Sequence, residues 1–134
     1  MSIQGRDFLH HAKDFVNMSC EAGFRSATSR SYYALYHEVC SILQHCPPTT
    51  HDGVLNYLTR DTRRNAEPFD KMSLIQLGAV LGQQKTKRKK ADYELDDDFL
   101  EIEAKSSIAV VEKMINKIDE LKNELKDKLQ NGSR

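Results

Sequence analysis

The chain has 134 residues, of which 39% are hydrophobic and 30% charged, and its formal net charge at pH 7 is zero. This length suits one domain with a single core, and the neutral balance argues against a protein that coats nucleic acid nonspecifically. No apolar run approaches the roughly 18 residues that a membrane helix needs, and no signal peptide follows Met1. The sequence therefore predicts a cytoplasmic protein with no membrane segment.

Five helices are predicted in chain order from the three- and four-residue spacing of apolar side chains. They cover about residues 4–19, 24–46, 51–63, 73–90 and 98–130. Pro47 and Pro48 end the second helix, and Thr49 or Thr50 is suited to cap the third. Asp98 resembles the first residue of a capping box for the last helix.

No segment alternates apolar and polar residues as a half-buried strand does, so the sequence predicts an all-α fold. The simplest arrangement is a bundle of four to five helices with an antiparallel core pair. One domain is expected over residues 1–130, followed by a frayed tail over residues 131–134. Gly78 and Gly82 lie in the fourth helix and would allow close approach by another helix.

Arg30 and His37 lie seven residues apart in the second predicted helix, about two turns, so they project from one face. This face lies opposite the apolar stripe that contains Leu35 and Ile42. Arginine binds phosphate through a planar fork of N–H groups, and histidine exchanges protons near neutral pH. The pair indicates metal-independent cleavage of RNA, with a solvated polar face as the alternative. Small and polar residues share this side: Ser26, Tyr33, Ala34 and Ser41.

Of these neighbours, Ser26, Tyr33 and Ser41 are candidates for supporting positions near the pair. Tyr33 lies one helical turn from both members of the pair, which suits stacking on a base or holding the histidine. Packing at a dimer interface is the other interpretation of Tyr33.

Five of the six residues 85–90 are basic, and residues 1–90 together carry a net charge of +5. One interpretation is a track that binds RNA phosphates, and the other is a solvated helix end whose cations complement the helix dipole. Arg88 is expected to pair with Asp92, four residues on. The candidate RNA-binding residues are Lys85, Lys87, Lys89 and Lys90.

The remaining reactive side chains are interpreted without a catalytic role. The three cysteines are expected to be buried thiols in a reducing compartment, because they are odd in number and lack metal-site spacing. No metal motif, glycine-rich phosphate loop or serine-nucleophile motif is present, so neither a metal nor a cofactor is predicted. Four other histidines are expected to be polar surface: His10, His11, His45 and His51.

Three motifs, in order along the chain, resemble those of the HEPN superfamily of small helical domains. Residues 30–37, Arg-Ser-Tyr-Tyr-Ala-Leu-Tyr-His, resemble the family's Arg-x(4–6)-His motif in its six-residue form. Residues 50–54, Thr-His-Asp-Gly-Val, are similar to the start of the short helix that follows in many members. Residues 88–93, Arg-Lys-Lys-Ala-Asp-Tyr, resemble the family's Arg-x-x-Ala-Asp-Tyr element, and a long final helix follows here as in the family.

The resemblance implies a metal-independent endoribonuclease with Arg30 and His37 as its active site, commonly assembled across a homodimer through the second helix. It also implies a toxin or phage-defence effector, with an antitoxin or a nucleotidyltransferase as a possible partner. Some toxin members carry a tyrosine two residues after the histidine, which a nucleotidyltransferase antitoxin modifies. Val39 stands at that place here, so this form of control does not transfer.

Two other functions stay open from the sequence. One is a non-catalytic module that dimerises, or docks a nucleotidyltransferase or another protein, through the second helix. The other is a protein that binds a small nucleotide. The presence of both Arg30 and His37 favours the enzyme, whereas overall neutrality favours the binding module.

Overall fold

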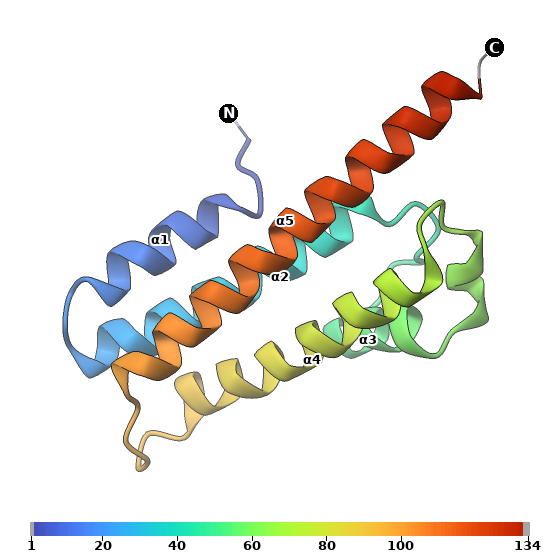
Figure 1. The fold of residues 1–134 in the computed structure, drawn as a ribbon. Coiled ribbons are helices and arrows are strands. Elements are labelled where there is room, and N and C mark those ends of the chain that lie inside the picture. The colour runs from blue at the N-terminus through green and yellow to red at the C-terminus, as the bar shows by residue number, and fades with distance from the viewer. Residues whose placement is uncertain (1, 133–134) are drawn as a thin grey trace.

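The computed structural model describes residues 2–132, and among them it contains α-helices and one short 3-10 helix but no strand (Figure 1). The predicted all-α bundle is confirmed. The elements are α1 (Asp7–Val16), α2 (Glu21–Ile42), α3 (His51–Thr59), η1 (Thr62–Ala66), α4 (Lys71–Tyr93) and α5 (Glu101–Asn131). None of these helices is both long and apolar enough to cross a bilayer.

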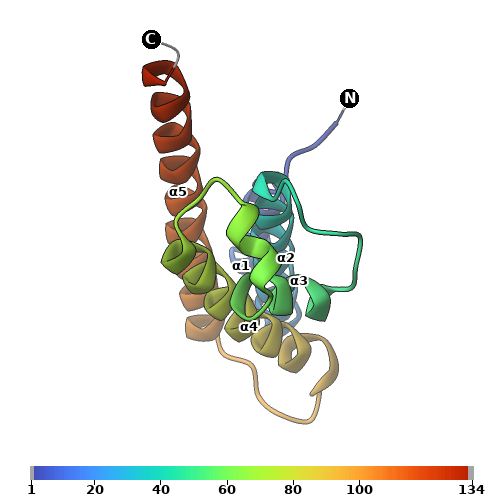
Figure 2. The ribbon, with the colours of Figure 1, turned by 90° about the vertical axis from the view of Figure 1, so that its right-hand side faces the viewer.

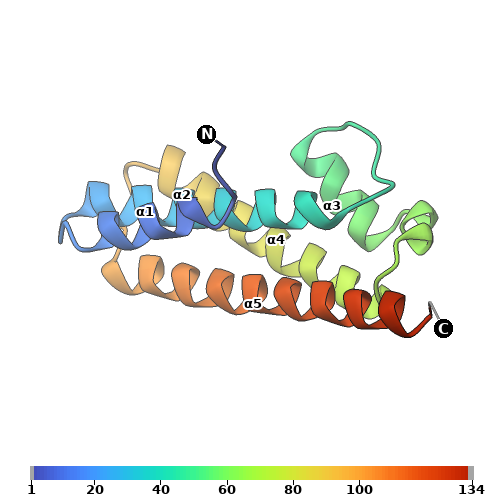
Figure 3. The same ribbon diagram turned by 90° about the horizontal axis from the view of Figure 1, so that it is seen from above.

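Helix α2 is the centre of the bundle, because α1, α4 and α5 all pack against it. α1 and α2 run antiparallel, and α5 lies alongside α2 over most of its length (Figures 1 and 3). Seen along the bundle, α3 stands outside the other helices and packs on α4 (Figure 2). The core side chains with no exposed surface include Leu35, Val39, Leu58, Leu74, Leu77, Leu81, Val111 and Ile118.

Hydrogen bonds explain where α3 begins, as predicted, and why it ends earlier than predicted. α3 begins at His51 as expected, since the Thr50 side chain accepts a hydrogen bond from the Gly53 amide at 3.1 Å. It ends at Thr59, four residues early, because the Asp61 carboxylate accepts from the Arg63 amide and starts η1 as a separate turn.

Helix α4 runs through the basic residues 85–90 and ends at Tyr93, beyond the predicted end near residue 90. The buried guanidinium of Arg25, on α2, donates hydrogen bonds to the backbone oxygens of Ala91 at 3.0 Å and Glu94 at 3.2 Å. These carbonyls have no partner within the helix, so the arginine stabilises the end of α4. Arg25 thereby also fixes α4 against α2.

Asp98 does not cap the last helix, so that prediction is wrong. α5 begins at Glu101, where the Glu103 carboxylate accepts a hydrogen bond from the Leu100 amide at 2.9 Å. The helix runs on through Asn131, and the amide of Gly132 donates to the Lys128 oxygen at 2.8 Å. Positions 133 and 134 of the predicted tail lie outside the described residues.

A three-residue ion-pair network ties α1 to the centre of the bundle. Arg6 donates through Nε to the Glu38 carboxylate of α2 at 2.7 Å, and through Nη2 to Asp119 of α5 at the same distance. The Arg6 backbone amide also donates to Glu38, at 3.0 Å. Glu38 is buried, so removing the arginine would leave a carboxylate without its compensating charge.

Candidate functional site

Arg30 and His37 are the only exposed residues of α2 between Gly23 and Cys40. The rest of this stretch is buried or half-buried because three helices surround α2. Ala34 is fully buried, so the expected polar side is solvated only at these two positions. Among residues 2–132, neither side chain forms a hydrogen bond or an ion pair, and both contact an aromatic ring instead. The fold therefore leaves both polar groups available for a ligand.

The ring of Phe8, on α1, brings the arginine and the histidine to one place. The guanidinium carbon of Arg30 lies 5.8 Å from the Phe8 centroid, and the His37 imidazole stacks on the same ring with centroids 5.5 Å apart. Two helical turns separate the backbones, yet both side chains lean toward one aromatic surface. The expectation that they share a face agrees with this geometry.

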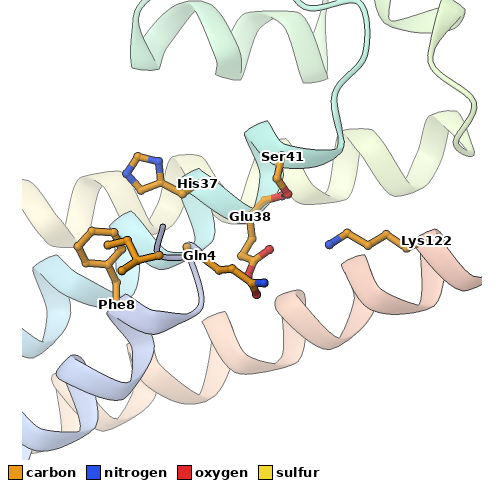
Figure 4. A pocket seen from close by; sticks show the side chains of 8 residues that line it. Gln4, Phe8, His37, Glu38, Ser41 and Lys122 are labelled. Carbon is orange, nitrogen blue, oxygen red and sulfur yellow. The ribbon is translucent and has the colours of Figure 1, made fainter. Parts of the chain in front are cut away.

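A cavity of about 580 Å³ opens beside His37, between the N-terminal segment, α2 and α5 (Figure 4). Phe8, His37 and Ser41 line it with the buried Glu38, and Lys122 extends toward them from α5. It is large enough for part of a nucleotide. Both charged and apolar groups are therefore offered to a ligand that reaches His37.

Gly5 sets how closely the N-terminal segment approaches this cavity. A Cβ atom at Gly5 would lie 2.8 Å from the His37 Cβ and 3.0 Å from the Ala34 oxygen. Only glycine fits at this distance, so the segment lies directly on the backbone of α2. His37 is consequently held between the N-terminal segment and the neighbours on its other side.

Those neighbours form an aromatic cluster of Tyr33, Tyr36 and His51. Tyr36 meets the His37 ring edge-on with centroids 5.4 Å apart, and stacks on the His51 ring at 3.9 Å. Tyr33 lies 6.4 Å from His37 and 6.1 Å from His51. Burial raises the pKa of Tyr36 to about 12, so it stays a neutral phenol at physiological pH.

Tyr33 also contacts the basic helix α4. Nη1 of Arg88 donates to the Tyr33 hydroxyl at 3.0 Å and pairs with Asp92 at 3.4 Å, which confirms the predicted pairing along α4. The Arg88 guanidinium lies over the rings of both Tyr32 and Tyr33. Tyr33 therefore contacts both Arg88 and His37, and it links α4 to the candidate site.

The other predicted supporting residues divide. Ser41 lines the cavity with His37 and donates to the Glu38 backbone oxygen at 2.6 Å. Ser26 lies eleven positions before His37 on the same helix, roughly 16 Å along the axis, and is not brought to the histidine. Ser41 therefore lies beside His37, whereas Ser26 lies one helical turn from Arg30 and does not line the cavity.

The predicted phosphate track does not form a single row. Lys85 pairs with Asp52 of α3, and Lys89 lies on the same side of α4, close enough to lower the pKa of Asp52. Lys90 pairs with Glu103 of α5 at 2.9 Å, and Lys87 lines a hollow with it on that opposite side. Of these four lysines, Lys85 and Lys89 are the two that face α3, the helix that carries His51.

His51 is the residue that the sequence interpretation missed. It was expected to be polar surface, but its Nδ1 lies 2.7 Å from the hydroxyl of the buried Tyr32, within the aromatic cluster. The chain turns through Pro47 and Pro48 between α2 and His51, and no helical period crosses such a turn. The one signal was the likeness of residues 50–54 to a family motif.

The cysteines also differ from expectation. Cys20 is exposed, whereas Cys40 and Cys46 are half-buried, and all three are free thiols. Burial raises the pKa of the Cys40 thiol, which makes it a weaker nucleophile at neutral pH. None of the three contributes an activated thiolate to the site around His37.

Among residues 2–132, no group of three or more His, Cys, Asp or Glu side chains is arranged to hold a metal ion. Comparisons of the chain with protein-family models, with curated proteins and with solved structures find no match. The likeness to the HEPN superfamily thus rests on the three sequence motifs, and a function has to be argued from the site itself.

Proposed function

We propose that this chain is a metal-independent endoribonuclease with Arg30 and His37 as its catalytic residues. One observation carries the proposal: these two side chains are the only exposed positions along the middle of the central helix, and neither has a polar partner among the described residues. An exposed arginine and histidine without such a partner do not satisfy any buried polar group of the fold. Their residue types are those that bind a phosphate and move a proton.

The chemistry follows from what RNA brings to the site. RNA carries its own nucleophile, the 2′-hydroxyl, so cleavage requires proton transfer and charge stabilisation. Arg30 would bind the scissile phosphate through two N–H groups and stabilise the negative charge of the transition state. His37 would transfer a proton to or from the reacting oxygens. The products would be a 2′,3′-cyclic phosphate and a 5′-hydroxyl, and DNA would resist.

The biological setting belongs to the same proposal. A homodimer formed through the face of the bundle that exposes Arg30 and His37 would bring two such pairs into one cleft. A nuclease of this kind would act as a toxin or a phage-defence effector, with an antitoxin or a nucleotidyltransferase as its partner. Light scattering coupled to size-exclusion chromatography would test the dimer, since a monomer at all concentrations would contradict it.

The decisive experiment is cleavage of end-labelled RNA in EDTA by wild type, Arg30→Ala and His37→Ala. We expect each variant to lose about 10²-fold or more of the rate while staying folded. Arg60→Ala and His10→Ala are matched controls, because each removes an exposed side chain of the same type, and His10 lies on the side of α1 away from Phe8. An all-deoxy copy of the substrate should stay intact.

Two outcomes would overturn the proposal. If cleavage needs added magnesium, the metal-independent mechanism is wrong. If wild type leaves several RNAs intact, the chain is better explained as a binding module that uses the face around Arg30 and His37 to hold a protein partner.

A further inference from the structure

His51 has one ring nitrogen engaged and the other open. Nδ1 forms a hydrogen bond with the Tyr32 hydroxyl at 2.7 Å, whereas Nε2 has no hydrogen-bond partner among residues 2–132. Tyr36 stacks on the ring at 3.9 Å and fixes its plane. These two contacts orient the imidazole and leave its Nε2 without a partner in this part of the chain.

The open imidazole of His51 lies close to that of His37. His37 is 5.4 Å and His51 is 3.9 Å from the same Tyr36 centroid, so the two rings are separated by less than the sum of these distances. A phosphodiester held between two imidazoles needs two hydrogen bonds of roughly 2.6–3.2 Å and the width of one phosphate group. This upper limit is compatible with both imidazoles contacting one phosphodiester.

The surroundings of His51 are positively charged. Lys85 and Arg88 face it from α4 and His37 faces it from α2, with Asp52 as the nearby acid on α3. Burial lowers the pKa of His51, and the neighbouring cations Lys85 and Arg88 lower it further. The ring is therefore neutral over a wider pH range than an ordinary histidine, which suits a proton acceptor beside an anionic substrate.

We propose that His51 is the general base of the same cleavage site, so that one chain supplies both imidazoles; the inference rests on the proposed endoribonuclease function. With Nδ1–H donated to the Tyr32 oxygen, Nε2 takes the proton of the 2′-hydroxyl. The 2′-oxygen forms a bond to phosphorus as the bond from phosphorus to the 5′-oxygen breaks. Protonated His37 gives its proton to the leaving oxygen, and exchange with water restores both rings.

The test compares RNA cleavage in EDTA by wild type, His51→Ala and Tyr32→Phe, with His10→Ala as the control. We expect His51→Ala to lose about 10²-fold or more in kcat with RNA affinity retained. Its pH–rate profile should lack the acid limb of wild type, and free imidazole should restore part of the rate. Tyr32→Phe should lose less, because the His51 ring keeps its Nε2 and loses only the hydroxyl that orients it through Nδ1.

A second measurement on wild-type protein does not depend on any variant folding. Titration with an all-deoxy oligonucleotide, which binds but is not cut, should shift the ring-proton NMR signals of His37 and His51 and leave those of His10 unchanged. An unmoved His51 signal, together with no rescue by imidazole, would reduce His51 to a structural support of α3 and overturn the inference.

The outcomes also separate this inference from the proposed function. His51→Ala that cuts as fast as wild type, while His37→Ala is silent, overturns the role of His51 and leaves the endoribonuclease standing. Wild type that cuts no RNA overturns both.

Discussion

Replacing Gly78 and Gly82 by alanine should change stability in opposite directions, although both lie on α4. A Cβ atom at Gly78 would lie 2.6 Å from the Thr59 Cγ2 and 2.9 Å from the Leu58 Cβ, both on α3. At Gly82 the nearest such atom, on Leu55, is 4.0 Å away, an ordinary contact. We expect Gly78→Ala to destabilise the protein and Gly82→Ala to stabilise it.

The size of each effect follows from two terms. Alanine in a helix interior is favoured over glycine by about 1 kcal/mol, and this gain applies to both variants. At Gly78 the neighbours cannot yield, because Leu58 is fully buried and Thr59 Oγ1 donates to the Leu55 oxygen at 2.7 Å. Overpacking of this kind costs about 1–3 kcal/mol, so the two variants should differ in free energy of unfolding by that amount.

Urea denaturation followed by far-ultraviolet circular dichroism measures the difference, since the chain has no tryptophan for fluorescence. The thermal midpoints should separate by about 4 °C for each kcal/mol. If Gly78→Ala proves as stable as Gly82→Ala, α3 does not pack this closely on α4. Because His51 is the first residue of α3, that result would also remove the basis for its position in the site.

Two further predictions concern pH and salt. The free energy of unfolding should fall as the pH drops below about 4. Hydrogen bonds from Arg6 lower the pKa of Asp119 in the folded protein. The stabilisation from Asp119 is therefore complete above the usual carboxyl pKa and is lost as the pH falls through the lowered pKa. Urea denaturation at pH 7 and pH 3 should show a smaller acid loss for Asp119→Asn, and an equal loss would contradict the linkage. Lys89→Ala, on the side of α4 that faces Asp52, should lower the log–log salt dependence of RNA binding by about 0.7, whereas Lys87→Ala should not. Fluorescence anisotropy with an all-deoxy oligonucleotide would measure both slopes, and equal slopes would refute the division of the basic run.

The helices and the Arg30–His37 pair could be predicted because both depend on local spacing. The apolar period and the Thr50 cap act within a few residues, so they locate the elements without any tertiary structure. The two prolines do not end α2, which stops at Ile42, and the Glu67 carboxylate accepts hydrogen bonds from the Gln44 and His45 amides beyond it. The pairing of Arg88 with Asp92 is local in the same sense. Some predicted helix ends, such as the one at Asp98, were wrong. Their positions depend on hydrogen-bond partners elsewhere in the chain or on a competing cap nearby.

The burial of α2 could not be predicted, because a helical wheel assumes one packing face. Three helices surround α2, so Ala34 on the expected polar side is fully buried and Glu38 is buried as an ion pair with Arg6. The division of the basic run also differs from the prediction of a single phosphate track. Its lysines are adjacent in sequence, but the helix turns by 100° per residue and distributes them to opposite sides of α4.

The site draws on four helices, which explains why so much of it is invisible in the motif around Arg30. Phe8 comes from α1, His37 from α2, His51 from α3 and Arg88 from α4, and each contacts an aromatic ring of the cluster or of its neighbours. Only the folded bundle brings these groups together, and the central helix holds them on a rigid frame. Loss of α3 packing should therefore reduce any activity that needs His51 before it unfolds α2, since α3 packs on α4 and stands outside the helices that surround α2.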